Sequence, residues 1–326
     1  MEQENCGNAG CKGVLLANLG TPERPERKSV ARFLREFLSD PRVVDLPRWL
    51  WLPLLNLVII PLRSARSAAA YQSIWLPEGS PLLVLTQRLA EKLSGKVKET
   101  TTVAVGMRYG EPSIATALEE LRQAGVNTLL VLPLYPQFSY TTTASIFDAV
   151  ENGLKAMNWQ PTVQHINDYH LQPAWVSAVA GNIRTFREEK GAAEKLLFSL
   201  HGIPQRYVKQ GDPYEEQCRA GMAAIAAEAG LTPDQWLLTY QSRVGREPWL
   251  QPYTDVVLKE LAAQGVRHVQ VVCPGFAVDC LETLEEIAIQ NREMFEKAGG
   301  ERLEYIPALN DSDSHVGVVE ALLSAQ

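Results

Sequence analysis

The segment Leu196–Pro204 has the sequence LLFSLHGIP, an apolar run that breaks at Gly-x-Pro. A similar segment, LLANLGTP, occupies Leu15–Pro22. Short apolar runs bounded by Gly and Pro are typical of buried strands in parallel sheets. We therefore expect each segment to be the first strand of an α/β unit.

Two further pairs of segments occur in the same order in both halves. MRYGEP (Met107–Pro112) matches SRVGREP (Ser242–Pro248), and GVNTLLVLP (Gly125–Pro133) matches GVRHVQVVCP (Gly265–Pro274). Alternating strand-like and helical patterns indicate parallel sheets with helices on both faces. The sequence thus predicts an α/β fold made of two copies of one doubly wound unit. The expected strands are Val14–Asn18, Thr102–Val105, Thr128–Pro133, Lys195–Leu200, Trp236–Tyr240 and His268–Val272, and the expected helices are Pro81–Leu93, Pro112–Gln123, Tyr214–Ala229 and Leu250–Ala263.

The composition is that of an ordinary globular protein. The chain has 326 residues, of which 46% are hydrophobic and 21% charged, and its net charge is −7. This acidic balance argues against binding to a nucleic-acid duplex, which usually needs a basic face. The first residues lack the apolar core of a secretory signal, and the cysteines have no C-x-x-C spacing. We expect a cytoplasmic protein with reduced thiols at Cys6, Cys11, Cys218, Cys273 and Cys280.

The first copy carries an insertion. The stretch from Gly20 to Arg108 is about 47 residues longer than the equivalent stretch from Gly202 to Arg243, and it includes the apolar run Trp49–Leu62. That run is too short to span a bilayer, but an insertion at this place lies above the sheet edge where ligands bind. We interpret it as a lip over a site, with a membrane-interface character. The alternative is a core helix of the first domain. The residues that suggest an interface are Arg42, Arg48, Arg63, Arg66, Trp49 and Trp51.

His201 is the first candidate for chemistry. It directly follows the strand of the LLFSLHGIP segment, at the carboxyl edge of the predicted sheet. An imidazole there can exchange a proton near neutral pH or bind a metal through either nitrogen. The alternative is a turn histidine that only stabilises the end of the strand.

Carboxylates follow the second GV…P segment. In PGFAVDCLETLEEI (Pro274–Ile287), Asp279 and Glu282 have the spacing of a capping box. A helix that begins here places Glu282, Glu286 and Gln290 on one stripe, with Glu285 beside it. Glu282 in a capping box is also common for stability alone. Together with His201, however, these carboxylates form a nitrogen and oxygen site that suits a divalent metal, proton transfer, or both.

Aromatic and basic residues border the same edges. Arg108 and Tyr109 end the MRY segment, and Gln241, Arg243 and Trp249 belong to the QSRVGREPWL segment. Flat apolar walls with guanidinium groups suit a large planar anion. Arg108 could instead form a structural salt bridge, and Trp249 could simply pack at a helix start. The chain contains no dinucleotide-binding, P-loop or nucleophile-elbow motif.

Taken together, these segments resemble the ferrochelatase family, which inserts ferrous iron into a porphyrin to make haem. The resemblance runs from about Gly13 to Leu309 and is closest to the proteobacterial type. The motifs that carry it are LLANLGTP, EGSPL (Glu78–Leu82), VLPLYPQFS (Val131–Ser139), SLHGIPQRY, YQSRVGREPWLQPYTD and CPGFAVDCLETLEE.

The resemblance implies a chelatase-like fold of two similar Rossmann-like domains, each with a parallel four-stranded sheet flanked by helices. The implied parts are residues 13–160 with a lip insertion at about 40–85, residues 161–309 with the catalytic groups, and a helix at 310–326 that packs back on the first domain. The implied catalytic residues are His201 and Glu282, and the implied metal-handling residues are His201, Glu282, Glu285 and Glu286. The implied porphyrin contacts are Leu19, Arg108, Tyr109, Trp249 and Phe276.

The implied activity is that of a lyase, which would make protohaem from protoporphyrin IX and Fe²⁺ as the last step of haem biosynthesis. Animal members have a histidine at the position of Cys280 and a cysteine-rich tail for a [2Fe–2S] cluster. Because no cysteine follows Cys280, we expect no cluster and no other cofactor. The apolar lip implies peripheral contact with the inner face of the cytoplasmic membrane. The alternatives are a non-catalytic haem or metal carrier, and a chelatase for coproporphyrin, cobalt or nickel.

Overall fold

The computed structural model describes residues 11–245 and 247–325, which form two compact units. The first comprises residues up to Tyr135, Tyr140–Asn167 and the end of the chain from Val319. The second comprises Pro136–Ser139 and Asp168–Val318. The main division between the units therefore follows Asn167. The sequence analysis places this division after residue 160.

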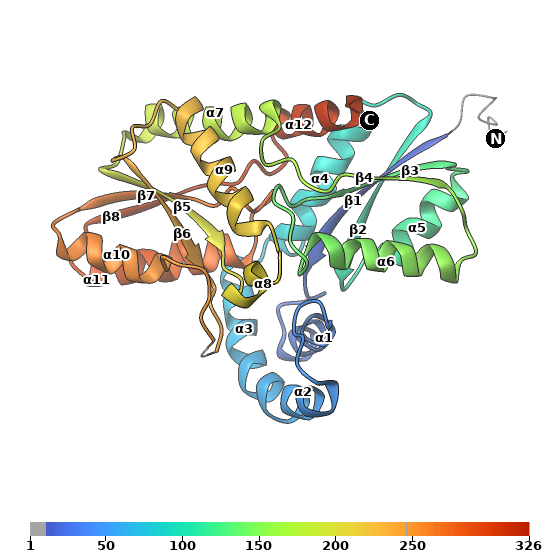
Figure 1. Cartoon of the computed structure of the whole chain (residues 1–326), viewed down its shortest axis with the longest axis horizontal. Helices are drawn as coiled ribbons and strands as arrows, with labels where there is room; N and C mark the ends of the chain where they lie inside the picture. The colour runs from blue at the N-terminus through green and yellow to red at the C-terminus, as the bar shows by residue number, and fades with distance from the viewer. Residues whose placement is uncertain (1–10, 246, 326) are drawn as a thin grey trace. The chain divides into compact units, whose positions relative to one another are not determined.

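The first unit is built on a four-stranded sheet with the order β2-β1-β3-β4, in which all neighbours are parallel. Helices α5 and α6 pack on one face, and α4 packs on the other (Figure 1). Its elements are β1 (Lys12–Gly20), α1 (Arg27–Leu38), α2 (Arg48–Leu54), the π-helix η1 (Leu55–Ile59), α3 (Ile60–Ile74), α4 (Pro81–Ser94), β2 (Thr101–Tyr109), α5 (Ile114–Gln123), β3 (Thr128–Pro133), α6 (Thr143–Ala156) and β4 (Thr162–His165).

The second unit repeats this topology, with the parallel strand order β6-β5-β7-β8. Helices α7 and α9 cover one face of the sheet, and α10 and α11 cover the other (Figure 1). Its elements are α7 (Pro173–Lys190), β5 (Lys195–His201), α8 (Gln205–Lys209), α9 (Tyr214–Glu228), β6 (Trp236–Gln241), α10 (Thr254–Ala263), β7 (His268–Val272), the π-helix η2 (Glu282–Asn291), α11 (Arg292–Lys297) and β8 (Arg302–Ile306). The last helix, α12 (Asp313–Ser324), contributes residues to both units.

Two parallel four-stranded sheets flanked by helices confirm the predicted fold class. β1 and β5 are central strands whose core positions are almost all buried, because parallel sheets are covered on both faces. The cores are apolar: Leu15 and Val131 are fully buried in the first unit, and Leu197 and Val269 in the second. The edge strands β4 and β8 were not predicted from the sequence.

The insertion forms α2, η1 and α3, and its apolar run divides between the core and the surface. Trp51, Leu55 and Ile60 pack against α1 in a small core of their own. The opposite side is exposed to the extent of 79% at Trp49, 77% at Leu57 and 74% at Leu62. The run therefore contributes both to a small core and to an exposed apolar surface. We call Trp49, Leu50, Leu54, Leu57, Val58 and Leu62 the apolar patch.

Two of the four arginines around this run are bound to other groups of the protein. The Arg42 guanidinium binds Asp148 at 2.7 Å, and Arg48 donates to the backbone oxygen of Ser39. Arg63 and Arg66 are exposed on α3.

Within residues 11–245 and 247–325, no helix combines the length and the apolar character needed to cross a bilayer.

The cysteines differ in state. Cys218, Cys273 and Cys280 are free thiols and buried, whereas Cys11 is disulfide-bonded. The expectation of a reduced thiol is therefore wrong at Cys11, and at Cys6 it lies outside the described residues.

His315 is buried, and we expect its burial to make the protein less stable in mild acid. Its Nδ1 lies 2.5 Å from the backbone oxygen of Asn310, and burial lowers its pKa to about 4. An unfolded histidine has a pKa of about 6.5, so the unfolded chain binds the proton first as pH falls below that value. We expect the free energy of unfolding to fall by about 2 kcal/mol between pH 7 and pH 5 from this group.

Urea unfolding of the natural chain and of His315→Asn at both pH values measures this effect. The asparagine amide can still donate to the Asn310 oxygen but does not titrate. An equal loss of stability in both proteins would contradict the assignment.

Candidate functional site

His201 ends β5, and its imidazole has one nitrogen fixed by the backbone. Nδ1 lies 2.7 Å from the backbone oxygen of Gly202, and the Tyr214 hydroxyl donates to the His201 oxygen at 2.9 Å. Because a carbonyl oxygen can only accept, the neutral ring carries its proton on Nδ1. Nε2 therefore keeps its lone pair, which can accept a proton or bind a metal.

The carboxylates lie on η2, a π-helix that runs from Glu282 to Asn291. Such helices are rare and frequently occur at functional sites. The expected capping box is wrong, because Asp279 has other partners. Its carboxylate accepts from Thr283 Oγ1 at 3.0 Å and from the Tyr305 hydroxyl at 2.6 Å. The backbone N–H of Cys280 donates to Thr283 Oγ1, so the start of the helix is fixed one residue later than predicted.

The end of β6 joins the sheet to this helix. Gln241 pairs with His201 in the β5–β6 register, and its amide nitrogen donates to the backbone oxygen of Glu282 at 2.8 Å. The next residue, Ser242, donates its backbone N–H to Glu286 Oε1 at 2.8 Å and its hydroxyl to Glu286 Oε2. The last residue of β6 and the residue that follows it therefore link the end of β5 to Glu282 and Glu286.

Glu286 is influenced by both of the predicted catalytic groups. Burial is the largest effect and raises the pKa of the Glu286 carboxyl. The hydrogen bonds from Ser242 and the charge of His201 act in the opposite direction, while the Glu282 carboxylate raises the pKa further. The charges of His201 and Glu282 thus both act on the proton affinity of the Glu286 carboxyl.

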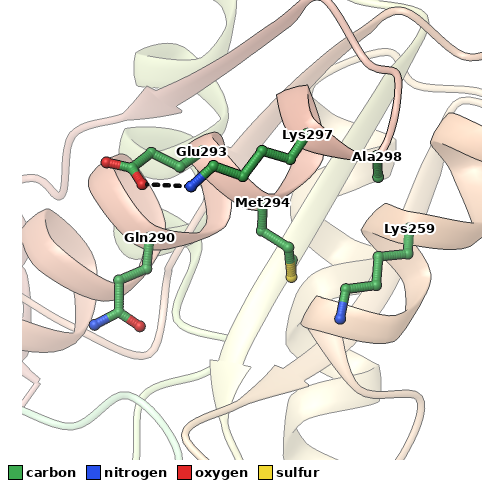
Figure 2. Close-up of a pocket in the computed structure, with 6 residues that line it drawn as sticks. All are labelled: Lys259, Gln290, Glu293, Met294, Lys297 and Ala298. Carbon is green, nitrogen blue, oxygen red and sulfur yellow. Dashed lines mark hydrogen bonds and ion pairs between the residues drawn. The ribbon is translucent and has the colours of Figure 1, made fainter.

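Glu285 has a different environment from Glu286. Both of its oxygens accept from Gln290 Nε2, at 2.7 and 2.8 Å. Gln290 in turn borders a pocket between α10 and the α11 segment, together with Lys259, Glu293, Met294, Lys297 and Ala298 (Figure 2). The one carboxylate among those lining residues, Glu293, is paired with Lys297 at 3.1 Å. This pocket therefore contains none of the predicted catalytic side chains.

The sequence-predicted metal residues do not form a closed coordination site in this structure. In the part of the chain that the structure describes, no three His, Cys, Asp or Glu side chains form a group that could hold a metal ion. His201, Glu282 and Glu286 are linked as described, and Glu285 is turned to Gln290.

Trp249 lies beside His201. The two ring centroids are 6.3 Å apart, and the indole packs so closely on Gly202 that an added Cβ would lie 3.2 Å from its ring. The indole nitrogen is buried, and the structure gives it no hydrogen-bond partner. Phe276, by contrast, follows β7 and packs partly against the core of the second unit. Arg243 stacks on Tyr253.

The other predicted porphyrin contacts lie in the first unit, where Asp40 organises them. The Asp40 carboxylate accepts from the Arg108 guanidinium and, at 2.7 Å each, from the Tyr109 and Ser145 hydroxyls. These hydrogen bonds lower the pKa of Asp40 against the opposing effect of burial. Arg108 thus forms the structural salt bridge that the sequence analysis gave as the alternative to a ligand contact. Tyr109 is 1% exposed.

Arg108 and Tyr109 nevertheless border a pocket of the first unit, whose other charged residues are Arg32, Arg35, Glu36 and Asp40. Leu19 is half-buried near the end of β1. The sequence analysis missed Asp40, although it lies in the same first-copy insertion, because a lone acidic residue in a loop gives no periodic signal.

Two buried thiols adjoin the carboxylates. Burial raises the pKa of Cys273 and of Cys280 well above the ordinary value. The neighbouring Glu282 charge adds to this effect at Cys280, and Glu286 adds to it at Cys273. Both thiols therefore stay protonated near neutral pH, which makes them poor nucleophiles and poor metal ligands.

Comparison with known proteins identifies the family. A profile of the family described as Ferrochelatase matches residues 11–326. A ferrochelatase of Methylococcus capsulatus is 55% identical over 311 residues, which are 95% of this chain and 95% of that protein. The chain belongs to the ferrochelatase family. A ferrochelatase of Yersinia enterocolitica is 50% identical with 95% and 96% coverage, and one of Hydrogenovibrio crunogenus is 47% identical with 98% and 87% coverage.

Solved structures show that this ferrochelatase-family chain has the fold of other chelatases. It is similar to SirB from Bacillus subtilis with Fe³⁺, with a TM-score of 0.55, 12% identity and 96% of both chains covered. A second similar structure is the sirohydrochlorin chelatase SirB from Bacillus subtilis subspecies spizizenii in complex with cobalt, with a TM-score of 0.54, 10% identity, and 96% and 92% of the chains covered. At this identity the likeness concerns the fold alone. Family membership makes the protein a metal chelatase and implies iron and porphyrin substrates and a place in haem biosynthesis.

Proposed function

We propose that this protein inserts Fe²⁺ into protoporphyrin IX to form protohaem, as a lyase in the last step of haem biosynthesis. Membership of the ferrochelatase family supports the reaction. The observation that carries the mechanism is the fixed tautomer of His201, whose Nδ1 donates to Gly202 and whose Nε2 is left as a base. The carboxylates of Glu282 and Glu286 supply oxygen ligands close to it.

Metal insertion makes two chemical demands on the protein. Two pyrrole N–H protons leave the porphyrin as Fe²⁺ enters, so the ring loses two protons for each doubly charged cation that it gains. His201 Nε2 accepts one pyrrole proton in this proposal, and the Glu282–Glu286 pair accepts the other and carries the cation toward the ring. Imidazole and carboxylate are both suitable ligands for Fe²⁺, so the same groups serve both demands.

The porphyrin itself has to be bent before a metal can enter its centre. A planar ring points its nitrogens and their hydrogens into one small hole, which blocks the metal. Contacts at the periphery can hold a bent ring and so lower the barrier at its centre. We propose Trp249, Phe276 and Leu19 as apolar contacts, and Arg108 and Tyr109 as contacts on the polar side. Arg108 would then act without leaving Asp40, to which it is bound in this structure.

An anaerobic assay of the natural chain tests the function. The protein is incubated with Fe²⁺ and either protoporphyrin IX or coproporphyrin III, and haem formation is followed by absorbance. We expect turnover with both rings and no turnover in a blank without protein. We expect the turnover with protoporphyrin to be faster than that with coproporphyrin. Tight haem binding without turnover would favour the carrier, and a preference for coproporphyrin or for Co²⁺ or Ni²⁺ would favour another chelatase. Activity without added iron–sulfur cluster or other cofactor would agree with the expectation that none is needed.

We further propose that the apolar patch binds the cytoplasmic membrane surface. Trp49, Leu57 and Leu62 are each about three-quarters exposed on one side of α2, η1 and the start of α3. Exposed apolar patches of this kind mark contact surfaces, and Arg63 and Arg66 are exposed beside it, where they can contact anionic headgroups. A less polar substrate such as protoporphyrin would be delivered from the same surface.

Replacing Trp49, Leu57 and Leu62 together with serine should weaken binding to vesicles that contain anionic lipid by about a thousandfold or more, because each side chain contributes about 1.5–3 kcal/mol on burial. Cosedimentation with vesicles measures the change. Trp51 is unsuitable for this test, because it is buried and its indole N–H donates to the Leu38 oxygen at 2.6 Å. Leu237→Ser, at an exposed position of β6, is the control. Unchanged vesicle binding by the triple variant would refute the proposal.

A further inference from the structure

Gln241 and Ser242 connect the sheet of the second unit to the carboxylates of η2. Gln241 is the last residue of β6, and it is buried, with 4% of its surface exposed. Its amide nitrogen donates to the Glu282 backbone oxygen at 2.8 Å and faces Glu286 Oε2 at 3.5 Å. Since the Glu282 oxygen can only accept, the amide nitrogen of Gln241 has to face the helix.

A series of buried, hydrogen-bonded side chains holds the amide oxygen of Gln241. Its amide oxygen accepts from Ser199 Oγ at 2.7 Å and from Cys273 Sγ at 3.5 Å. Ser199 Oγ lies 2.8 Å from Thr254 Oγ1, which donates to Thr239 Oγ1 at 2.9 Å. Strands β5 and β6, the residue directly after β7 and helix α10 therefore all contribute to the orientation of one amide.

Ser242 has a backbone conformation that is uncommon for its residue type. Its φ is +65°, in the left-handed region that non-glycine residues seldom adopt. This conformation turns both its N–H and its hydroxyl toward Glu286, so that each carboxylate oxygen receives one donor. Backbone conformations of this kind persist where the surrounding structure fixes them, and they are concentrated at functional sites.

We propose that Gln241 and Ser242 are positioning residues that hold the Glu286 carboxylate and the first turn of η2 in the orientation that receives the divalent cation. The proposal rests on the proposed function. Neither residue touches the reacting atoms: both act through Glu286 and through the backbone of Glu282. Partners of this kind around a metal-binding carboxylate typically alter metal affinity or activity by 10- to 100-fold when removed.

Two substitutions at one position separate the hydroxyl from the backbone. Ser242→Gly removes the hydroxyl and adopts φ of +65° without strain, whereas Ser242→Ala removes the hydroxyl and keeps the strain. Both variants retain the backbone N–H donor. The matched control is Ser177→Ala, which removes a serine–glutamate hydrogen bond of 3.3 Å to Glu228 on the surface of the same unit.

The measurements are kcat and the KM values for Zn²⁺ and for porphyrin, together with Zn²⁺ binding by calorimetry in the absence of porphyrin. In both Ser242 variants we expect kcat/KM for Zn²⁺ and Zn²⁺ affinity to fall about tenfold, with an unchanged KM for porphyrin. We expect Ser177→Ala to behave like the natural chain. Thermal unfolding should show Ser242→Gly to be at least as stable as the natural chain, so loss of folding does not explain its defect.

Three results would overturn the inference while leaving the proposed function intact. One is an active natural chain with unchanged Zn²⁺ parameters in both Ser242 variants. Another is a defect in Ser242→Ala that Ser242→Gly lacks, which would assign the effect to the backbone. The third is an equal rise in both KM values, which would indicate a general structural role. An inactive natural chain would instead overturn the proposed function.

Discussion

Replacing His201 with alanine is expected to lower kcat for Fe²⁺ insertion by at least about a hundredfold, because general acid–base groups contribute roughly 10²–10⁴-fold. The loss follows from the removal of Nε2, the basic nitrogen that the bond from Nδ1 to the Gly202 oxygen leaves free. Anaerobic haem formation measures kcat, and quenching of porphyrin fluorescence measures whether the ring still binds. We expect binding to persist.

His201→Asn distinguishes the chemical role from a structural one. An asparagine amide can replace the Nδ1–H donor to Gly202 but provides no base, so this variant should fold normally and remain inactive. Added imidazole should partly restore activity to the alanine variant, where it can occupy the vacated space. His268 is the control: it lies at the opposite end of neighbouring β7, where it contacts Glu304 at 2.8 Å. Near-normal activity of His201→Ala, or equal loss in His268→Asn, would contradict the assignment.

Glu282→Gln is expected to reduce kcat by a similar factor, roughly 10²–10⁴-fold, if the carboxylate removes protons or carries the metal. The substitution keeps the shape of the side chain, and the backbone oxygen of residue 282 can still accept from Gln241. Porphyrin binding should therefore be retained and the melting temperature nearly unchanged. The same absorbance assay, repeated with Zn²⁺, measures the effect.

Glu293→Gln provides the comparison for this variant. Glu293 is exposed on α11, directly after η2, and pairs with Lys297. Its loss removes the same charge from the same helical segment without touching the His201–Glu286 group, so it should leave kcat unchanged. If both glutamine variants were equally impaired, general acidity of the segment would explain the result better than a specific role of Glu282.

The central strands and one edge strand of each sheet were predictable from sequence, whereas the other edge strands, β4 and β8, were not. Thr128–Pro133 and His268–Val272 match β3 and β7 to the residue, because strands buried on both faces leave continuous apolar runs. β4 and β8 lie at the sheet edges and contain half-buried and exposed positions. Such mixed patterns do not distinguish a short strand from a loop.

The sheet edge that carries the candidate site was predictable, whereas the geometry of the site was less so. The ends of β5 and β6 meet at one sheet edge, which is why His201 and the QSR segment could be placed together. The π-helix was not predictable, because its hydrogen-bond pattern leaves no distinct mark on hydrophobic spacing. Nor does the sequence indicate that Ser242 adopts a positive φ. Trp49 and Trp51 have the same chemistry, and only their helix faces decide which is exposed.

The neutral state of Cys273 and Cys280 has a consequence for iron traffic. Thiolate sulfur binds late first-row cations strongly and releases them slowly, which suits storage or a permanent structural site. Burial raises the pKa of both thiols well above the ordinary value, which disfavours the thiolate forms that bind such cations. Under the proposed function, the protein would therefore hand its cargo onward rather than keep it.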